Sequence, residues 1–60
     1  MTEAQAMYAA IDAAQTLTDL DALYVSWIGY SAVADNPATT AEELHADLLD
    51  YVLEATTAAA

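Results

Sequence analysis

Residues 40–56, TAEELHADLLDYVLEAT, decide the fold of this chain. Thr40 followed three residues later by Glu43 is a capping box, which is typical of a helix start, and Glu42 adds a second carboxylate at the positive helix end. Apolar residues then recur three or four positions apart and form one stripe: Leu44, Leu48, Val52 and Ala55. The segment therefore predicts an amphipathic helix over residues 41–56 with this stripe facing a core.

Helical spacing also fills the N-terminal half of the chain, which contains one glycine and one proline in all. Over residues 3–15 the apolar side chains fall on one side of a helix: Ala4, Met7, Tyr8, Ile11 and Ala14. Thr18 and Asp21 resemble a capping box with Asp in place of Glu, so a second helix is expected to begin near Asp19.

The sequence Asp35-Asn36-Pro37 is expected to end that second helix at about residue 34, because the residue before a proline is pushed out of the α region. The prediction is an all-α fold, a compact three-helix bundle with helices at about residues 3–15, 19–34 and 41–56 in a single domain, 1–60. A chain of this size buries only ~60% of its unfolded surface. With no cysteine to form a disulfide, stability must come from helix packing, a partner or self-association.

The helix expected at 19–34 is apolar on both sides. One side carries Leu20, Leu23, Tyr24, Trp27, Ser31 and Ala34, and the other carries Ala22, Val25, Gly29 and Val33. A helix that is apolar all round is normally buried all round. Two interpretations stay open: the flanking helices sandwich this helix, or its Val25, Gly29 and Val33 side is a homodimer seam or a partner-binding patch.

The charge of the chain is entirely negative. It contains no lysine and no arginine, and ten aspartates and glutamates give a net charge of -10. Ordinary composition predicts about six basic residues in this length. Such a surface repels anions, which argues against direct nucleic-acid binding and against an anionic membrane, and it suits a basic surface on another macromolecule.

Targeting signals are not evident in the sequence. The longest uncharged stretch, residues 22–34, is shorter than the ~20 residues that cross a bilayer as a helix. Residues 1–5, Met-Thr-Glu-Ala-Gln, have no basic n-region of a signal peptide. We expect no membrane association and a cytoplasmic location.

The sharpest local pattern is a row of carboxylates on the 41–56 helix, spaced 4, 3 and 4 residues apart: Glu43, Asp47, Asp50 and Glu54. We call these four residues the carboxylate row. By helix geometry they fall within an arc of ~60° and span ~16 Å. Two interpretations apply, a solvated helix face or an imitation of the regularly spaced phosphates of a nucleic acid. A solvated face normally includes lysine or arginine at i+4, and this one has none.

Further candidates for partner contact surround the row. Asp19, Asp21, Asp35 and Glu42 extend the negative surface, although Asp19 and Asp21 are also suited to the N-terminal end of a helix and Asp35 to a turn. Tyr30 and Tyr51 are candidate interface anchors, and partial core burial is the alternative for both.

Catalytic chemistry has little support in this sequence. His45, the single histidine, falls toward the Leu48 side of its helix and is expected to be packed or half-buried. Ser26 and Ser31 lack the surroundings of a catalytic nucleophile, and no segment matches a calcium-binding loop. We expect no enzyme activity, no catalytic residue, no metal site and no cofactor.

In its size, its lack of lysine and arginine and its carboxylate row, the chain resembles the small acidic DNA-mimic proteins encoded by phages and other mobile elements, and among these it looks most like anti-CRISPR proteins. That resemblance implies a basic nucleic-acid-binding protein or a CRISPR surveillance complex as partner. The chain would bind where DNA phosphates lie and block DNA binding without chemistry, in the cytoplasm of the host cell.

Two other classes of function fit the same composition. One is an acidic protein-interaction module, such as an antitoxin-like neutraliser of a basic partner or a histone-binding protein. The other is a small structural protein adapted to high salt, for which acidic surfaces are a known device. A salt-adapted protein is expected to keep a few arginines, and this chain has none.

Overall fold

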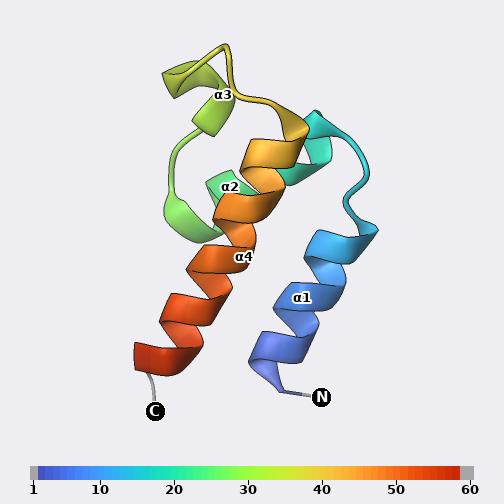
Figure 1. The fold of residues 1–60 in the computed structure, drawn as a ribbon, viewed down its shortest axis with the longest axis vertical. Coiled ribbons are helices and arrows are strands. Elements are labelled where there is room, and N and C mark those ends of the chain that lie inside the picture. Colours follow the sequence, from blue (N-terminus) through green and yellow to red (C-terminus); the bar gives the residue numbers. More distant parts are fainter. Residues whose placement is uncertain (1, 59–60) are drawn as a thin grey trace.

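The computed structural model describes residues 2–58, and its regular structure over that range is all helical. Four helices follow in order: α1 Glu3–Ala13, α2 Leu17–Ile28, α3 Ala32–Asp35 and α4 Ala41–Ala58. α1 runs antiparallel to α4, whereas α2 runs in the same direction as α4 (Figure 1). The expected all-α class is confirmed. The expected number of helices is corrected, because the 19–34 segment forms α2 and the short α3.

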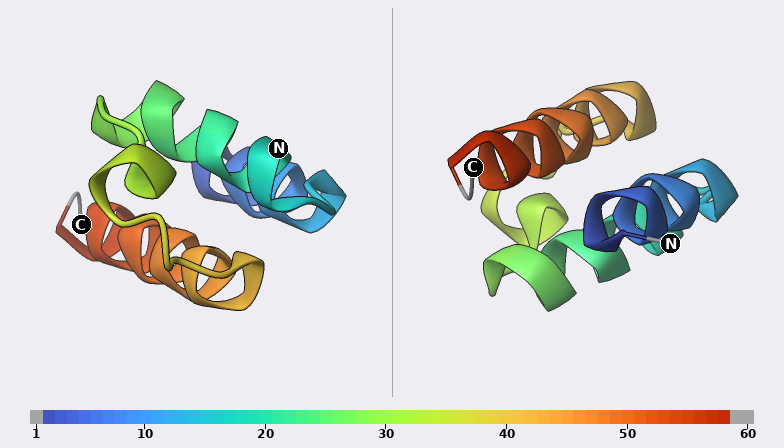
Figure 2. Two further views of the ribbon diagram at one scale, coloured as in Figure 1. Left: turned by 90° about the horizontal axis from the view of Figure 1, so that it is seen from above. Right: turned by 90° about the horizontal axis from the view of Figure 1, so that it is seen from below.

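The core lies where α4 meets α1 and α2. Its buried side chains come from all three helices: Ile11 of α1, Leu20 of α2, and Leu44, Leu48 and Val52 of α4. Seen end-on, α1, α2 and α4 occupy the corners of a triangle, with α3 between α2 and α4 (Figure 2). α4 therefore supplies three of the five buried side chains. The apolar stripe predicted for it is confirmed at Leu44, Leu48 and Val52 and wrong at Ala55, which is exposed in the turn after Val52.

The sandwich interpretation of the second helix is wrong. α2 packs mainly on α4 and only slightly on α1, and Val25 on its outer side is 45% exposed. Gly29 is exposed and Val33 is half-buried. A homodimer seam or partner-binding patch at Val25, Gly29 and Val33 stays a prediction.

Threonine side chains begin the three longer helices. Thr2 accepts a hydrogen bond from the backbone N–H of Gln5, and the Gln5 side chain returns one to the Thr2 N–H. Thr40 accepts from the Glu43 N–H at 3.2 Å, which confirms the start predicted for the last helix. The start near Asp19 is wrong, because Thr16, not Thr18, is the N-cap of α2 and accepts from the Asp19 N–H.

The break between α2 and α3 is made by Gly29, whose φ of 103° lies in the left-handed region that ends helices readily at glycine. Ser31 then caps α3 by accepting a hydrogen bond from the Ala34 N–H. α3 ends at Asp35, two residues before Pro37, so the predicted stop applies to α3 and not to α2.

The other helix ends differ slightly from those predicted. α1 ends at Ala13 and not at residue 15, because Ala14 is extended, with ψ 109°. α4 continues to Ala58, past the predicted end at 56, and the Thr56 hydroxyl donates to the Val52 and Leu53 carbonyls within it. Residues 1, 59 and 60 of the expected 1–60 domain lie outside the described residues.

Candidate functional site

The carboxylate row lies on the solvent side of α4. All four of its members, Glu43, Asp47, Asp50 and Glu54, are exposed. The opposite side of the same helix carries Leu44, Leu48 and Val52, each 0% exposed. Because these buried side chains hold α4 against α1 and α2, the carboxylates extend from a helix that is fixed in place along most of its length.

The four carboxylates of the row repel one another. No lysine or arginine exists in the chain to pair with any of the four carboxylates. Glu42 and Glu43 in the first turn complement the helix dipole, whereas the last turn of α4 carries no basic residue. Like-charged neighbours at i+3 and i+4 destabilise a helix by ~0.2–0.5 kcal/mol per pair. The row is thus a set of fixed negative charges that only solvent ions or a partner can neutralise.

Asp21 differs from the other predicted contact residues, because its carboxylate is used inside the chain. Its Oδ2 accepts a hydrogen bond from the Ser31 hydroxyl at 2.7 Å, and its Oδ1 accepts from the Ala32 N–H at 2.9 Å and more weakly from the Val33 N–H at 3.4 Å. Asp21 is half-buried and fixes α3 on α2. Its negative charge is therefore directed at the start of α3 and away from a partner.

The remaining predicted carboxylates are on the surface. Asp19 and Glu42 are exposed in the first turns of α2 and α4, as the alternative based on helix ends predicts for Asp19. Asp35 is exposed in the last position of α3. Of these three residues, only Glu42 is next to a member of the carboxylate row in the sequence. Asp19 and Asp35 belong to other helices.

The two predicted anchor tyrosines have different surroundings. Tyr51 is half-buried, its ring stacks on Trp27 with centroids 6.3 Å apart, and its hydroxyl donates to the Trp27 carbonyl at 3.3 Å. Tyr30 lies in the turn after α2 and is 52% exposed. Of the two, Tyr30 is the one whose ring is accessible to a partner.

Tyr30 is held in place by Tyr24 of α2. Their rings meet edge to face, with centroids 5.3 Å apart and an interplanar angle of 82°. The Tyr24 hydroxyl donates to the Tyr30 hydroxyl at 2.9 Å. This hydrogen bond, then burial, and then the negative charges of Tyr30, Asp47 and Asp35 raise the pKa of Tyr24 from its ordinary value of 10.0 to about 12.

Tyr24 was not among the residues predicted for a site. The sequence placed it on the core stripe with Trp27, and it does pack partly against the core. Its hydroxyl nevertheless reaches Tyr30 across the turn at Gly29. In a continuous helix over 19–34, Tyr24 and Tyr30 would lie more than one turn apart. Their contact could be predicted only by recognising that the helix breaks at Gly29.

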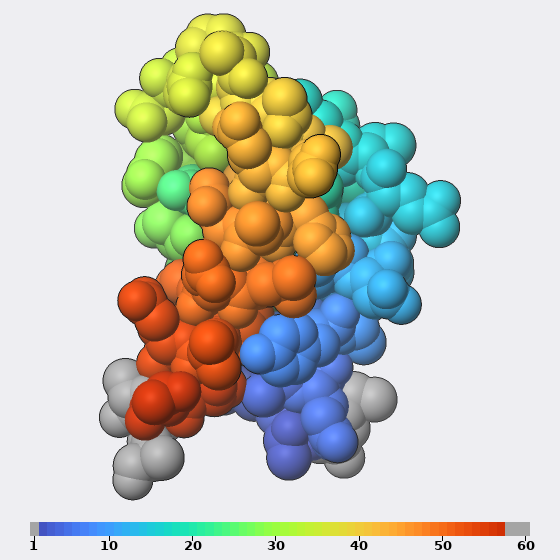
Figure 3. Space-filling model, in the orientation of Figure 1, coloured from blue at the N-terminus to red at the C-terminus, as the bar shows by residue number. Residues whose placement is uncertain are grey.

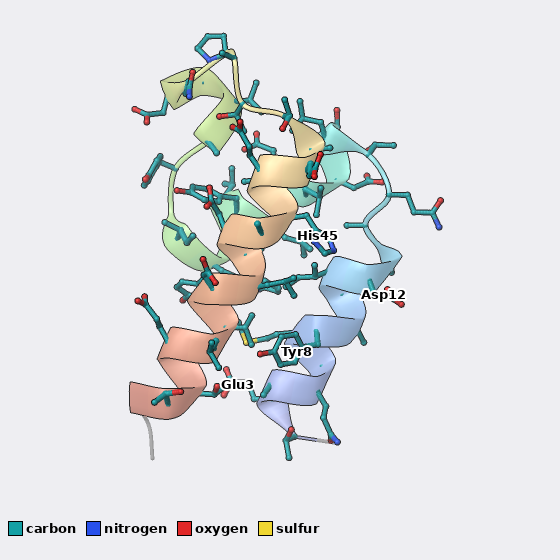
Figure 4. All side chains as sticks on the ribbon, viewed as in Figure 1. Glu3, Tyr8, Asp12 and His45 are labelled. Atoms are coloured by element: carbon teal, nitrogen blue, oxygen red, sulfur yellow. The ribbon has the colours of Figure 1, made fainter. Side chains whose placement is uncertain are left out.

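Features of other kinds of site are sparse in residues 2–58. His45 is half-buried, as expected, and projects from α4 on the side of α1 (Figure 4). No three histidine or acidic side chains among these residues are grouped as a metal site would require, and no pocket is found in this range. The face that carries α4 has no deep hollow (Figure 3). No helix in the described part of the chain is both long enough and apolar enough to cross a bilayer.

Comparisons of the chain with models of protein families, with curated proteins and with solved structures found no match.

Proposed function

We propose that this protein is an acidic DNA-mimic inhibitor that binds the basic nucleic-acid-binding surface of a target complex and so prevents nucleic acid from binding there. A CRISPR surveillance complex is the target class that the resemblance to anti-CRISPR proteins suggests. The observation that carries the proposal is the carboxylate row, four exposed negative charges on one side of a helix that its other side anchors in the core.

Charge spacing supports this function. Successive members of the row are separated by ~4.5–6 Å along the helix axis, and the row spans ~16 Å. Phosphates on one strand of duplex DNA rise by ~3.4 Å per nucleotide. The row therefore resembles a phosphate backbone in the sign of its charges and, roughly, in their number per unit length. A groove lined with lysine and arginine that binds phosphates could bind α4 in the same way. Binding requires no bond chemistry, only competition for the same basic side chains.

The experiment that tests the proposal is capture from a bacterial lysate by the immobilised protein, followed by elution with duplex DNA. We expect a nucleic-acid-binding complex to be retained at low salt and released by the DNA, since both ligands would occupy one surface. Retention of such a complex that DNA does not displace would contradict mimicry and favour a neutraliser that binds elsewhere. Retention of no nucleic-acid-binding protein would refute the proposal.

Two double variants with the same change in charge sharpen this test. D47N/D50N removes the centre of the carboxylate row, and E3Q/D12N removes two charges from α1. Because an exposed ion pair is worth ~0.2–1 kcal/mol, the first variant should bind the purified target about two- to thirty-fold more weakly. E3Q/D12N should bind nearly as the parent does. Equal losses in both variants would mean that only net charge matters.

A further inference from the structure

A pair of tyrosines, one half-buried and one exposed, lies within the electrostatic reach of Asp47 in the carboxylate row. Tyr24 of α2 and Tyr30 in the following turn meet edge to face and share a hydroxyl-to-hydroxyl hydrogen bond of 2.9 Å. Asp47, a member of the row, and Asp35 at the end of α3 both act electrostatically on Tyr24, after the larger effects of the Tyr30 hydrogen bond and burial. We call Tyr24, Tyr30, Asp35 and Asp47 the tyrosine surface.

Tyr30 is the accessible ring of the tyrosine surface and is not needed for the core, whereas Tyr24 is half-buried and packs against the core. Tyr30 is 52% exposed and does not belong to the buried cluster or to the apolar side chains packed on it. Asp35 of α3 and Asp47 of α4 are both exposed. The hydrogen bond and the edge-to-face contact fix the Tyr30 ring in the free protein, so a partner need not order it.

We infer that the tyrosine surface is a docking site for an arginine side chain of the target, and that it makes the protein prefer arginine-rich over lysine-rich basic surfaces. This inference rests on the proposed function and adds a specific anchor to it. The guanidinium group of arginine is planar, stacks on aromatic rings and donates paired hydrogen bonds to carboxylates. The ammonium group of lysine is a compact point charge that does not use a ring and a carboxylate in this way.

Charge selects this occupant over the others. Nucleic acid would meet Asp35 and Asp47 as like charges. In a two-fold symmetric dimer through this surface, a second copy of the chain would place its own Asp35 and Asp47 against them, with no lysine or arginine in either chain to compensate. A cationic segment neutralises both carboxylates and covers the exposed ring at the same time.

The test compares oligoarginine and oligolysine peptides of equal length, titrated into the protein at low salt and followed by calorimetry. The parent protein should bind oligoarginine more tightly than oligolysine, by about two- to five-fold through the tyrosine contribution. Tyr30→Leu removes the aromatic ring and should bring the two affinities together by that factor, with oligolysine binding unchanged. Tyr30→Phe keeps the ring and should keep the preference.

Tyr8→Leu is the matched control, because Tyr8 is also an exposed tyrosine, 39% accessible, but it lies on α1 (Figure 4). It should leave the preference as in the parent. Circular dichroism of each variant establishes that it is folded. An arginine preference that is absent in the parent, or that is the same in Tyr30→Leu and Tyr8→Leu, would overturn the inference. Sedimentation that showed a dimer dissociated by Tyr30→Leu would also overturn it, in favour of a second copy.

The failure of this inference can be told from the failure of the proposed function. If DNA displaces the captured target but Tyr30→Leu binds that target as tightly as the parent does, the DNA-mimic function stands and the tyrosine anchor is wrong. If the arginine preference depends on Tyr30 but DNA does not displace the target, the surface binds arginine and the DNA-mimic function is wrong.

Discussion

The D47N/D50N variant should be more stable than the parent protein, although it is expected to bind the target more weakly. Asp47 and Asp50 occupy the centre of the carboxylate row, so neutralising these two removes all three neighbouring like-charge pairs, at i+4, i+3 and i+4. Asparagine has nearly the same size and helix propensity as aspartate. Both positions are exposed, so no core contact changes.

The size of the effect follows from the number of pairs. Each like-charge pair at this spacing costs ~0.2–0.5 kcal/mol, so relief of three pairs should raise the free energy of unfolding by about 0.6–1.5 kcal/mol at low salt. In a chain of this length, 1 kcal/mol corresponds to a shift of ~4–8 °C in the melting temperature. The screening length falls from ~30 Å at ~0.01 M salt to ~3 Å at ~1 M. The stabilisation should therefore nearly vanish at the higher salt concentration.

Thermal unfolding followed by circular dichroism, at low and high salt, measures this difference. E3Q/D12N has the same charge change and is the control, since neither Glu3 nor Asp12 has an acidic neighbour at i+3 or i+4. Glu3 lies at the start of α1 and Asp12 near its end, so neutralising Glu3 weakens and neutralising Asp12 improves the interaction with the helix dipole. The two effects oppose each other. A D47N/D50N variant that is less stable than the parent at low salt would refute the reasoning, because the carboxylates would then make stabilising contacts. A gain that is the same at high salt would show that charge repulsion is not its cause.

Three further predictions concern the fold. Leu48→Ala leaves a cavity at a fully buried position and should lower the free energy of unfolding by ~2–5 kcal/mol. The total expected for 60 residues is ~3–9 kcal/mol. A loss under ~1 kcal/mol in urea unfolding would mean that α4 is not the centre of the core. Asp21→Ala removes the acceptor of three hydrogen bonds and should lower the free energy of unfolding by about 2 kcal/mol. It should also speed amide hydrogen exchange in α3. Unchanged exchange in α3 would contradict the role of Asp21 in holding α3 on α2. Tyr30→Phe removes the main cause of the raised pKa of Tyr24, so ultraviolet titration should show the Tyr24 pKa falling from about 12 toward 10.0. A pKa of Tyr24 that is higher in the folded state stabilises the protein fully below pH ~10, and this stabilisation is lost as the pH rises toward ~12. The parent should therefore lose more stability than Tyr30→Phe between these pH values. Equal losses would contradict the hydrogen bond to Tyr30 as the cause of the raised pKa.

The last helix was predictable because its signals are local and agree with one another. A threonine cap, acidic residues in the first turn and an apolar stripe of period 3.6 all indicate the same start and the same buried side, and Leu44, Leu48 and Val52 are buried accordingly. The exposure of the carboxylate row followed from the same pattern, because its members lie on the side opposite that stripe.

The division of the second helix was not predictable from the pattern alone. A glycine inside an apolar helix costs only ~1 kcal/mol, so the helical spacing that continues past Gly29 outweighed it in the prediction. The decisive interactions are the local cap at Ser31 and the hydrogen bonds from Ser31 and Ala32 to Asp21. The bonds to Asp21 join residues ten or more positions apart. These hydrogen bonds exist only once the chain has turned, so no local signal reveals them. The internal role of Asp21 was missed for the same reason.

The position of the row on α4 bears on the choice between a binding function and salt adaptation. Salt adaptation requires acidic residues on the surface but no particular spacing, and charges spread over the exposed sides of α1 and α2 would avoid one another. Here four of the ten carboxylates stand at i, i+4, i+7 and i+11 on one side of a single helix, where their repulsion is largest. The cost of about 0.6–1.5 kcal/mol compares with a total stability of about 3–9 kcal/mol for a chain of this length. That cost falls on α4, the helix with the most buried residues. The proposed binding function gives a reason for a destabilising row on this helix, because a partner then meets negative charges on a well-anchored element, whereas salt adaptation requires no such row.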